Sequence, residues 1–339
     1  MPVKLGGGGG GGNTPFPTIV FQTSRTWTCP MAMEAMVFVI GAGGGGAAGC
    51  AQGSNKVITN GGGGGGCSVS KLTLAAQDYT VVVGSRGSGG SRSEAQGNGV
   101  DDGSAGGNST FAGSGITTMA GNGGGGGSGQ RADNPVSGVV AGGTATGGTI
   151  ANNTGGGCPN RSLSNHYSNA GSGGGVGIWE VGEANLMAVS TNQLVQGGGP
   201  FRNRGLGVTS IPGGEGGTSV GMLTGDIFKG IQQMVRDQSS NGYASHPTRY
   251  NNSVNYTGRP VKIMPPLNVT NYRWPSGSSP FTGGAGLVIA GSGYSGQGSA
   301  GVAGGGGGSC SFSNGTFGTA YGGTGGNGVI IIMPLTVGT

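Results

Sequence analysis

The chain alternates between short apolar runs and long glycine-rich polar stretches. The apolar runs contain many β-branched and aromatic residues, are bounded by glycine, and lie at 36–40, 79–83, 287–289 and 329–332. Runs of this length and composition are typical of short buried strands. Residues 68–74 instead alternate between polar and apolar side chains, which is the period of a strand with one exposed face. With 79–83 they predict a half-exposed antiparallel hairpin.

Glycine fills the space between these strands: it makes up 88 of the 339 residues. Each glycine is destabilising by about 0.5–1 kcal/mol relative to alanine, so folding requires close lateral packing of the backbone. Collagen is excluded because glycine does not recur at every third position, and disorder fits poorly with embedded strands. The expected fold class is mainly β or irregular. It combines a small antiparallel β-sheet unit with a layered bundle of polyglycine II-type helices and long loops.

The composition divides the chain into five segments. A glycine-containing arm precedes a compact unit with strands, and a segment with few strong strands follows. A stretch poor in glycine interrupts the pattern before glycine returns. The predicted boundaries are 1–24 for the N-terminal attachment arm, 25–120 for a glycine-rich β domain, 121–225 for a helical-array segment, 226–282 for an aromatic and proline-rich loop insert, and 283–339 for a closing segment with a C-terminal strand.

The insert is expected to contain one short helix. Asp226 can cap a helix that continues to about Asp237, with apolar residues along one face. Prolines beyond this helix favour irregular loops. A long insertion in a compact frame is more often functional than decorative.

Charge and cysteine content exclude several classes. The net charge is +5, but the 16 basic residues are spread thinly and form no run, so nucleic-acid binding is not expected. No apolar run is long enough to span a membrane, and no secretory leader is expected. The five cysteines lack CxxC spacing, which argues against zinc. We expect buried free thiols, with a disulfide between Cys50 and Cys67 as the alternative.

The motifs that could indicate catalysis are weak. Residues 41–46 fit G-x-G-x-x-G after a strand, but no helix can begin after them and no acidic residue follows at the spacing that holds a ribose. His166 and His246 are far apart in the sequence and lack a local partner motif. An ordinary turn explains Asp101 and Asp102 better than a calcium site does. We therefore expect a non-enzymatic protein with no catalytic residues, no cofactor and no metal.

Three stretches, each a strand joined to a glycine run, resemble a known family. They are Trp27-Thr28-Cys29-Pro30 leading to the Gly-Ala-Gly-Gly-Gly-Gly run at 41–46, the strand 79–83 before Gly84, and Gly-Gly-Asn-Gly before the strand 329–332. They resemble the glycine-rich domain of bacteriophage tail-fibre and tail-tip proteins, in which the first motif usually reads Trp-Thr-Val-Pro and Cys29 replaces the valine. The resemblance covers 25–120 and 283–339 but not the insert. It implies a polyglycine layer against a small sheet, displayed at a fibre tip.

The resemblance also implies recognition of a cell surface through variable loops, and the insert supplies the candidate residues. Tyrosine, tryptophan and arginine dominate recognition hot spots because they combine a rigid surface with a polar group. The receptor-binding candidates are Tyr243, Tyr250, Tyr256, Tyr272, Trp274, Arg249, Arg259 and Arg273. The alternative is that several of them form a hydrophobic core within the insert.

The expected function is that of a phage virion structural protein at a tail fibre or tail tip, made in the host cytoplasm. It would bind a bacterial surface glycan or outer-membrane protein, and its N-terminal arm would attach it to other fibre or tail proteins. A homo-oligomer, specifically a trimer, is expected. The main alternative is a purely structural glycine-rich fibre, either a head fibre or an extracellular filament. An ice-binding polyglycine bundle is a third class.

Overall fold

The part of the chain that the computed structural model describes forms twenty-one strands and no helix. It comprises residues 18–52, 57–92, 99–131, 139–157, 168–171, 173–174, 176, 187–188, 193–195, 286–290, 303–306, 309–313 and 320–337. The mainly β part of the predicted fold class is therefore confirmed. The helix predicted at 226–237 lies outside the described residues.

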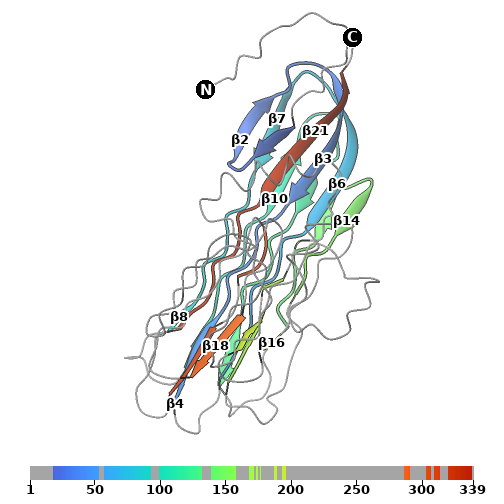
Figure 1. Ribbon diagram of the computed structural model, residues 1–339. Coiled ribbons are helices and arrows are strands. Elements are labelled where there is room, and N and C mark those ends of the chain that lie inside the picture. The colour runs from blue at the N-terminus through green and yellow to red at the C-terminus, as the bar shows by residue number, and fades with distance from the viewer. Residues whose placement is uncertain are drawn as a thin grey trace, which may run out of the picture.

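Two five-stranded sheets face each other at one end of the molecule, and we call this pair the sandwich (Figure 1). All strand pairs within it are antiparallel. The first sheet has the order β1 (Ile19–Phe21), β21 (Val329–Val337), β3 (Met33–Ile40), β6 (Cys67–Leu74) and β14 (Ala151–Asn153). The second has the order β13 (Ala145–Thr146), β11 (Met119–Gly121), β10 (Ser109–Ala112), β7 (Asp78–Val82) and β2 (Arg25–Thr28).

Aromatic side chains fill the space between the two sheets. Tyr79 stacks on Phe111 with ring centroids 5.1 Å apart, and Trp27 lies 5.8 Å from Tyr79. Phe21 from the first sheet meets the edge of Trp27 at 5.8 Å. Stacked and edge-to-face contacts of this kind add about 0.5–1.5 kcal/mol each beyond the burial of their area. The core of the sandwich thus joins strands distant in sequence.

The continuous apolar runs of β3 and β21 arise because the first sheet is buried on both faces. Val37 and Ile330 belong to the core between the sheets, whereas Phe38 and Ile331 belong to a second buried cluster. Successive side chains of a strand point to opposite faces, so a strand buried on both sides has no polar alternation.

The predicted hairpin between 68–74 and 79–83 is wrong. These segments form β6 and β7, but β6 pairs with β3 and β14, whereas β7 pairs with β2 and β10. The turn between them carries the chain from one sheet to the other. The alternation in β7 places Tyr79 and Val81 in the core between the sheets, whereas β6 contributes Leu74 to this core and Val69 to the second buried cluster.

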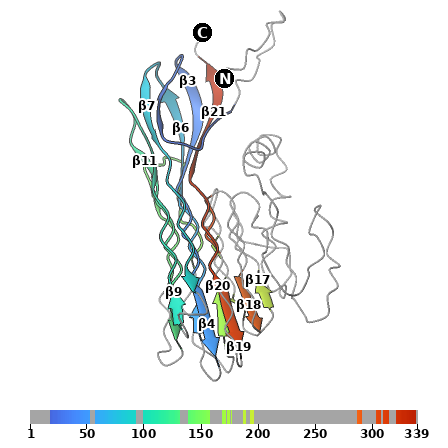
Figure 2. The same ribbon diagram turned by 90° about the vertical axis from the view of Figure 1, so that its left-hand side faces the viewer.

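Glycine-rich tracts lead away from the sandwich as long extended segments that are not strands (Figure 2). Backbone hydrogen bonds with N···O distances of 2.7–3.0 Å connect them, and we call this region the glycine layer. Its most continuous tracts are 41–47, 60–66, 84–90, 102–107, 121–127 and 322–328, with shorter pieces at 139–144, 154–157, 173–174 and 303–306.

Tract 41–47 lies inside this layer, and all of its residues are buried. Its N–H groups follow a period of three, since every third one donates to the same neighbour. Gly41, Gly44 and Ala47 donate to tract 60–66, Ala42 and Gly45 to 102–107, and Gly43 and Gly46 to 322–328. The layer therefore holds together through peptide groups.

Short strands form the end of the molecule opposite the sandwich, which we call the distal end (Figure 2). One sheet has the order β17 (Gln193–Val195), β18 (Gly286–Ala290), β19 (Ser309–Ser313), β4 (Ala48–Gln52) and β9 (Gly99–Asp101). The others are β12 (Gly129–Arg131), β5 (Val57–Thr59), β15 (Ser168–Gly171) and β16 (Met187–Ala188), and the pair β20 (Ala320–Tyr321) and β8 (Ser91–Arg92). Parallel pairing occurs here between β18, β19 and β4, and between β15 and β5.

Candidate functional site at the distal end

The glycine layer determines which parts of the chain reach the distal end. Tract 41–47 leads from β3 to β4, and tract 60–66 returns from β5 to β6. Tract 84–90 leads from β7 to β8, and tract 102–107 returns from β9 to β10. The chain thus crosses the layer repeatedly, and the links between distal strands begin and end at this end of the molecule.

The two ends of the segment 196–285 are attached to the distal end. This segment joins β17 to β18, which form an antiparallel pair in the register Gln193 to Val288 and Val195 to Gly286. The pair continues the sheet through β19 to β4 (Figure 2). The receptor-binding candidates fall within this segment and outside the described residues. They are Tyr243, Arg249, Tyr250, Tyr256, Arg259, Tyr272, Arg273 and Trp274.

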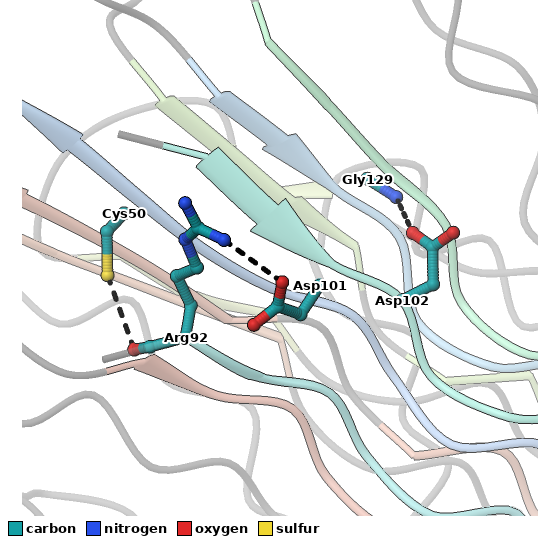
Figure 3. Close-up of polar contacts among 5 residues, drawn as sticks. All are labelled: Cys50, Arg92, Asp101, Asp102 and Gly129. Atoms are coloured by element: carbon teal, nitrogen blue, oxygen red, sulfur yellow. Dashed lines mark hydrogen bonds and ion pairs between the residues drawn. The ribbon is translucent and has the colours of Figure 1, made fainter. Parts of the chain in front are cut away.

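A group of polar contacts fixes the distal strands β4, β8 and β9 relative to each other (Figure 3). Arg92 Nη1 lies 3.2 Å from Asp101 Oδ1, with the two side chains 17% and 31% exposed. The guanidinium covers Gly99, where an added Cβ would lie 2.5 Å from Arg92 Nη2. The thiol of Cys50 donates to the backbone carbonyl of Arg92 at 3.5 Å. Gly99 therefore makes room for an ion pair that joins β8 to β9.

The second carboxylate of the Asp101–Asp102 pair also has a structural contact. Asp102 Oδ1 accepts a hydrogen bond of 2.8 Å from the backbone N–H of Gly129, at the start of β12 (Figure 3). Both carboxylates thus hold neighbouring backbone or side chains. Among the described residues, no group of three or more His, Cys, Asp or Glu side chains is placed to hold a metal ion.

Tyr321 is an exposed aromatic residue at the distal end that the sequence analysis did not select. Its exposed fraction is 43%, and it lies opposite Ser91 in the β20–β8 pair. Arg131, at the end of β12, is also exposed. The sequence signal was weak, because a single tyrosine before a glycine run resembles any strand end. The distal end thus exposes one aromatic and one cationic side chain on two different strands.

The described cysteines are buried free thiols, as expected. Cys29, Cys50 and Cys67 form no disulfide, so the alternative disulfide between Cys50 and Cys67 is wrong. Cys50 lies in β4 at the distal end, whereas Cys67 begins β6 in the sandwich. Burial raises the pKa of the Cys67 thiol far above its ordinary value. Burial also raises the pKa of Cys29, and a backbone hydrogen bond at Met31 partly opposes this shift.

The glycines of the G-x-G-x-x-G match serve backbone packing. An added Cβ at Gly43 would lie 1.8 Å from Gly304 O, and one at Gly45 would lie 1.9 Å from Ser88 O. A phosphate-binding loop needs N–H groups that point into an open space. Here the N–H groups of both residues donate to neighbouring tracts.

These features define a mainly β protein whose two ends are joined by a glycine layer. Residues 18–242 match the sequence profile of the glycine-rich domain family, and the chain belongs to this family. No curated protein matches the chain. The described residues contain no helix that is long and apolar enough to cross a membrane.

Proposed function

We infer that the tracts of the glycine layer are polyglycine II-type helices. Such a helix has three residues per turn, so its peptide groups point in three directions in turn. The N–H donors of tract 41–47 follow this period, and its carbonyls accept hydrogen bonds from a second set of neighbouring tracts. Ala42 and Gly45 accept from Gly124 and Gly127, Gly43 and Gly46 accept from Gly87 and Gly90, and Gly44 accepts from Gly306. Three donor and three acceptor directions give six neighbours, the arrangement expected of a hexagonal bundle.

Burial in the outer tracts supports the same inference. In tract 84–90 the buried residues are Gly84, Gly87 and Gly90, and the residues between them are exposed or half-buried. A helix with three residues per turn at the rim of a bundle turns one residue in three inward. At about 3.1 Å per residue, a seven-residue tract spans about 22 Å. The layer is then a stiff spacer between the sandwich and the distal end.

We propose that this chain is a non-enzymatic structural protein of a bacteriophage tail fibre or tail tip that binds the bacterial surface with its distal end. The observation that carries this proposal is the pairing of β17 with β18 at the distal end, because segment 196–285, which contains the aromatic insert, starts and finishes at these two strands. The assignment to a phage rests on the motif resemblance around Trp27 and the glycine runs. The ligand would be a surface glycan or an outer-membrane protein, and the N-terminal arm would attach the protein to its fibre.

Competition for adsorption tests this proposal. The full chain, added in excess to susceptible bacteria, is expected to block adsorption of the phage that encodes it. The double variant Tyr272→Ala/Trp274→Ala should lose at least tenfold in blocking potency while its melting temperature stays unchanged. Met31→Ala, an exposed side chain next to β3, is the matched control and should block normally.

Two outcomes would contradict receptor binding. A folded variant without residues 240–280 that still blocks adsorption would show that the insert does not bind the receptor. Assembly of the pure protein into long filaments with no binding to any cell would support the purely structural fibre instead. Immunogold labelling of the virion distinguishes a tail tip from a head fibre.

A further inference from the structure

The C-terminal segment 320–337 runs through all three regions of the molecule: the sandwich, the glycine layer and the distal end. In the sandwich, β21 lies between β1 and β3, so the first sheet is incomplete without it. Its residues contribute to both buried clusters: Ile330 and Ile332 to the core between the sheets, and Val329 and Ile331 to the second cluster.

The same segment completes the glycine layer and the distal end. Gly322, Gly325 and Gly328 donate to tract 84–90, while Gly323 and Gly326 accept from tract 41–47. At the distal end β20 pairs with β8, with Ala320 opposite Arg92. Removing the segment would therefore open one continuous slot between β1 and β3, along the neighbouring tracts 41–47 and 84–90, and beside β8.

The slot recognises the segment mainly through backbone hydrogen bonds and register, and these are identical in every copy of the chain. A second copy's segment 320–337 would fit it as well as the chain's own. The segment is attached through residues 314–319, which separate β19 from β20. Six linking residues span at most about 25 Å when extended. Two copies could trade segments only when they lie side by side in the same direction, with their distal ends close together.

We propose that copies of this chain held side by side exchange residues 320–337 during folding, so that each copy completes the other's sandwich and glycine layer. Domain swapping of this kind repeats the contacts of the closed monomer, so only the connection differs. A tethered segment competes at an effective concentration of about millimolar. For copies free in solution at micromolar concentration, closure by the chain's own segment is therefore favoured over exchange by a factor of about 10³. Copies joined at a fibre have a local concentration similar to that of the tethered segment, so exchange can compete with closure.

The exchange is confined to folding, because a closed segment is held at once by strands β1, β3 and β8 and by tracts 41–47, 84–90 and 303–306. It goes beyond the proposed function by specifying how copies join. Its test does not involve cell binding, so failure of either proposal can be recognised separately.

Complementary single-cysteine chains test the exchange. Met36 lies opposite Met333 in the β3–β21 register, and both are half-buried. Opposite residues in an antiparallel pair lie within the Cα separation that a disulfide bridges. Full-length Met36→Cys and Met333→Cys chains of different mass would each be fused at the N-terminus to one strand of a parallel coiled coil, then unfolded, mixed, refolded and oxidised. A disulfide between the two chains requires that β21 of one lies against β3 of the other.

We expect at least tenfold more linked heterodimer in the co-refolded sample than in a sample mixed after separate folding. The double variant Met36→Cys/Met333→Cys in an unfused chain should form its disulfide within one chain, which verifies the register. A second pair, Glu34→Cys with Thr336→Cys, repeats the test at another position of the same register. Equal, low amounts of linked heterodimer in both samples, for both pairs, would overturn the proposal, as would failure of the double variant to form its internal disulfide.

Discussion

Gly43→Ala is the substitution that most directly tests whether the glycine layer stabilises the fold. Gly43 is buried in tract 41–47, and an added Cβ would lie 1.8 Å from the carbonyl oxygen of Gly304. The atom it would meet is backbone, so no side chain can rotate away. Ordinary van der Waals contact begins at about 3.4 Å, so one tract must move by about 1.6 Å (3.4 − 1.8).

This displacement breaks hydrogen bonds on both sides of the residue. Gly43 N donates to Gly326 O, and Gly43 O accepts from Gly87 N, both at 2.9 Å. Leaving a buried peptide group without its partner costs about 1–3 kcal/mol. Two broken bonds therefore predict a loss of about 2–6 kcal/mol, while the reduced freedom of the unfolded chain returns only about 0.4–1 kcal/mol. A domain is typically stable by about 5–15 kcal/mol, so the variant should lose a large part of its stability.

Gly125→Ala is the matched control, because it is the same substitution in the same layer with more room. Its added Cβ would lie 3.1 Å from Ala141 O, so a shift of a few tenths of an ångström suffices. The expected change is within about 1 kcal/mol of wild type. Urea denaturation followed by the fluorescence of Trp27 measures both variants. If Gly43→Ala unfolds within 1 kcal/mol of Gly125→Ala, the layer is looser than these contacts require, and the reasoning fails.

Three further perturbations address the sandwich, the distal ion pair and the buried thiols. Phe111→Ala should destabilise the protein by about 3–5 kcal/mol, because the ring is fully buried. Val82→Ala, at an exposed position in β7, should change the free energy of unfolding by no more than about 0.5 kcal/mol. The midpoints of urea denaturation compare the two variants with the wild type. Arg92→Ala should lower the free energy of unfolding by about 1–3 kcal/mol, because it leaves the partly buried Asp101 unpaired. Arg92→Lys should restore only part of this loss. Equal stability of the wild type and both variants would contradict a stabilising role of the Arg92–Asp101 ion pair. Cys67 should resist thiol reagents in the folded protein. Its raised pKa predicts that its contribution to the free energy of unfolding is full below the ordinary thiol pKa and falls as the pH rises above that value. If the free energy of unfolding of the wild type, measured relative to Cys67→Ala, does not change with pH, this prediction is refuted.

The sequence predicts strands where apolar character alone determines them. The runs 36–40, 287–289 and 329–332 fall within β3, β18 and β21, respectively. The run 79–83 covers most of β7 and extends one residue beyond it. Each is a β-branched or aromatic run long enough to be buried, so its local preference and its tertiary environment agree. The pairing of β6 and β7 was predicted wrongly, because alternation defines an apolar face but not the strand that pairs with it.

Apart from β18, the distal strands could not be predicted, because their residues carry no periodic apolar signal. β4 reads Ala-Gly-Cys-Ala-Gln and β19 reads Ser-Cys-Ser-Phe-Ser, and they become strands through parallel pairing with each other. The sequence also does not show which glycine tracts lie side by side, because one run of glycine resembles another. The Arg92–Asp101 contact could not be predicted either, because it joins β8 to β9, two short strands with no apolar run.

Cohesion through peptide groups explains how one frame can carry changing binding loops. In tract 41–47 every described hydrogen bond joins backbone to backbone, and the contacts that exclude a Cβ at Gly43, Gly44 and Gly45 are also with backbone. The sandwich supplies side-chain specificity at the other end, where Tyr79 and Phe111 stack. The layer is held together by backbone contacts that leave no room for side chains, so the sequences joining the distal strands can vary without altering these contacts. A frame with this division suits a surface-binding tip, in which recognition must change faster than the structure that presents it.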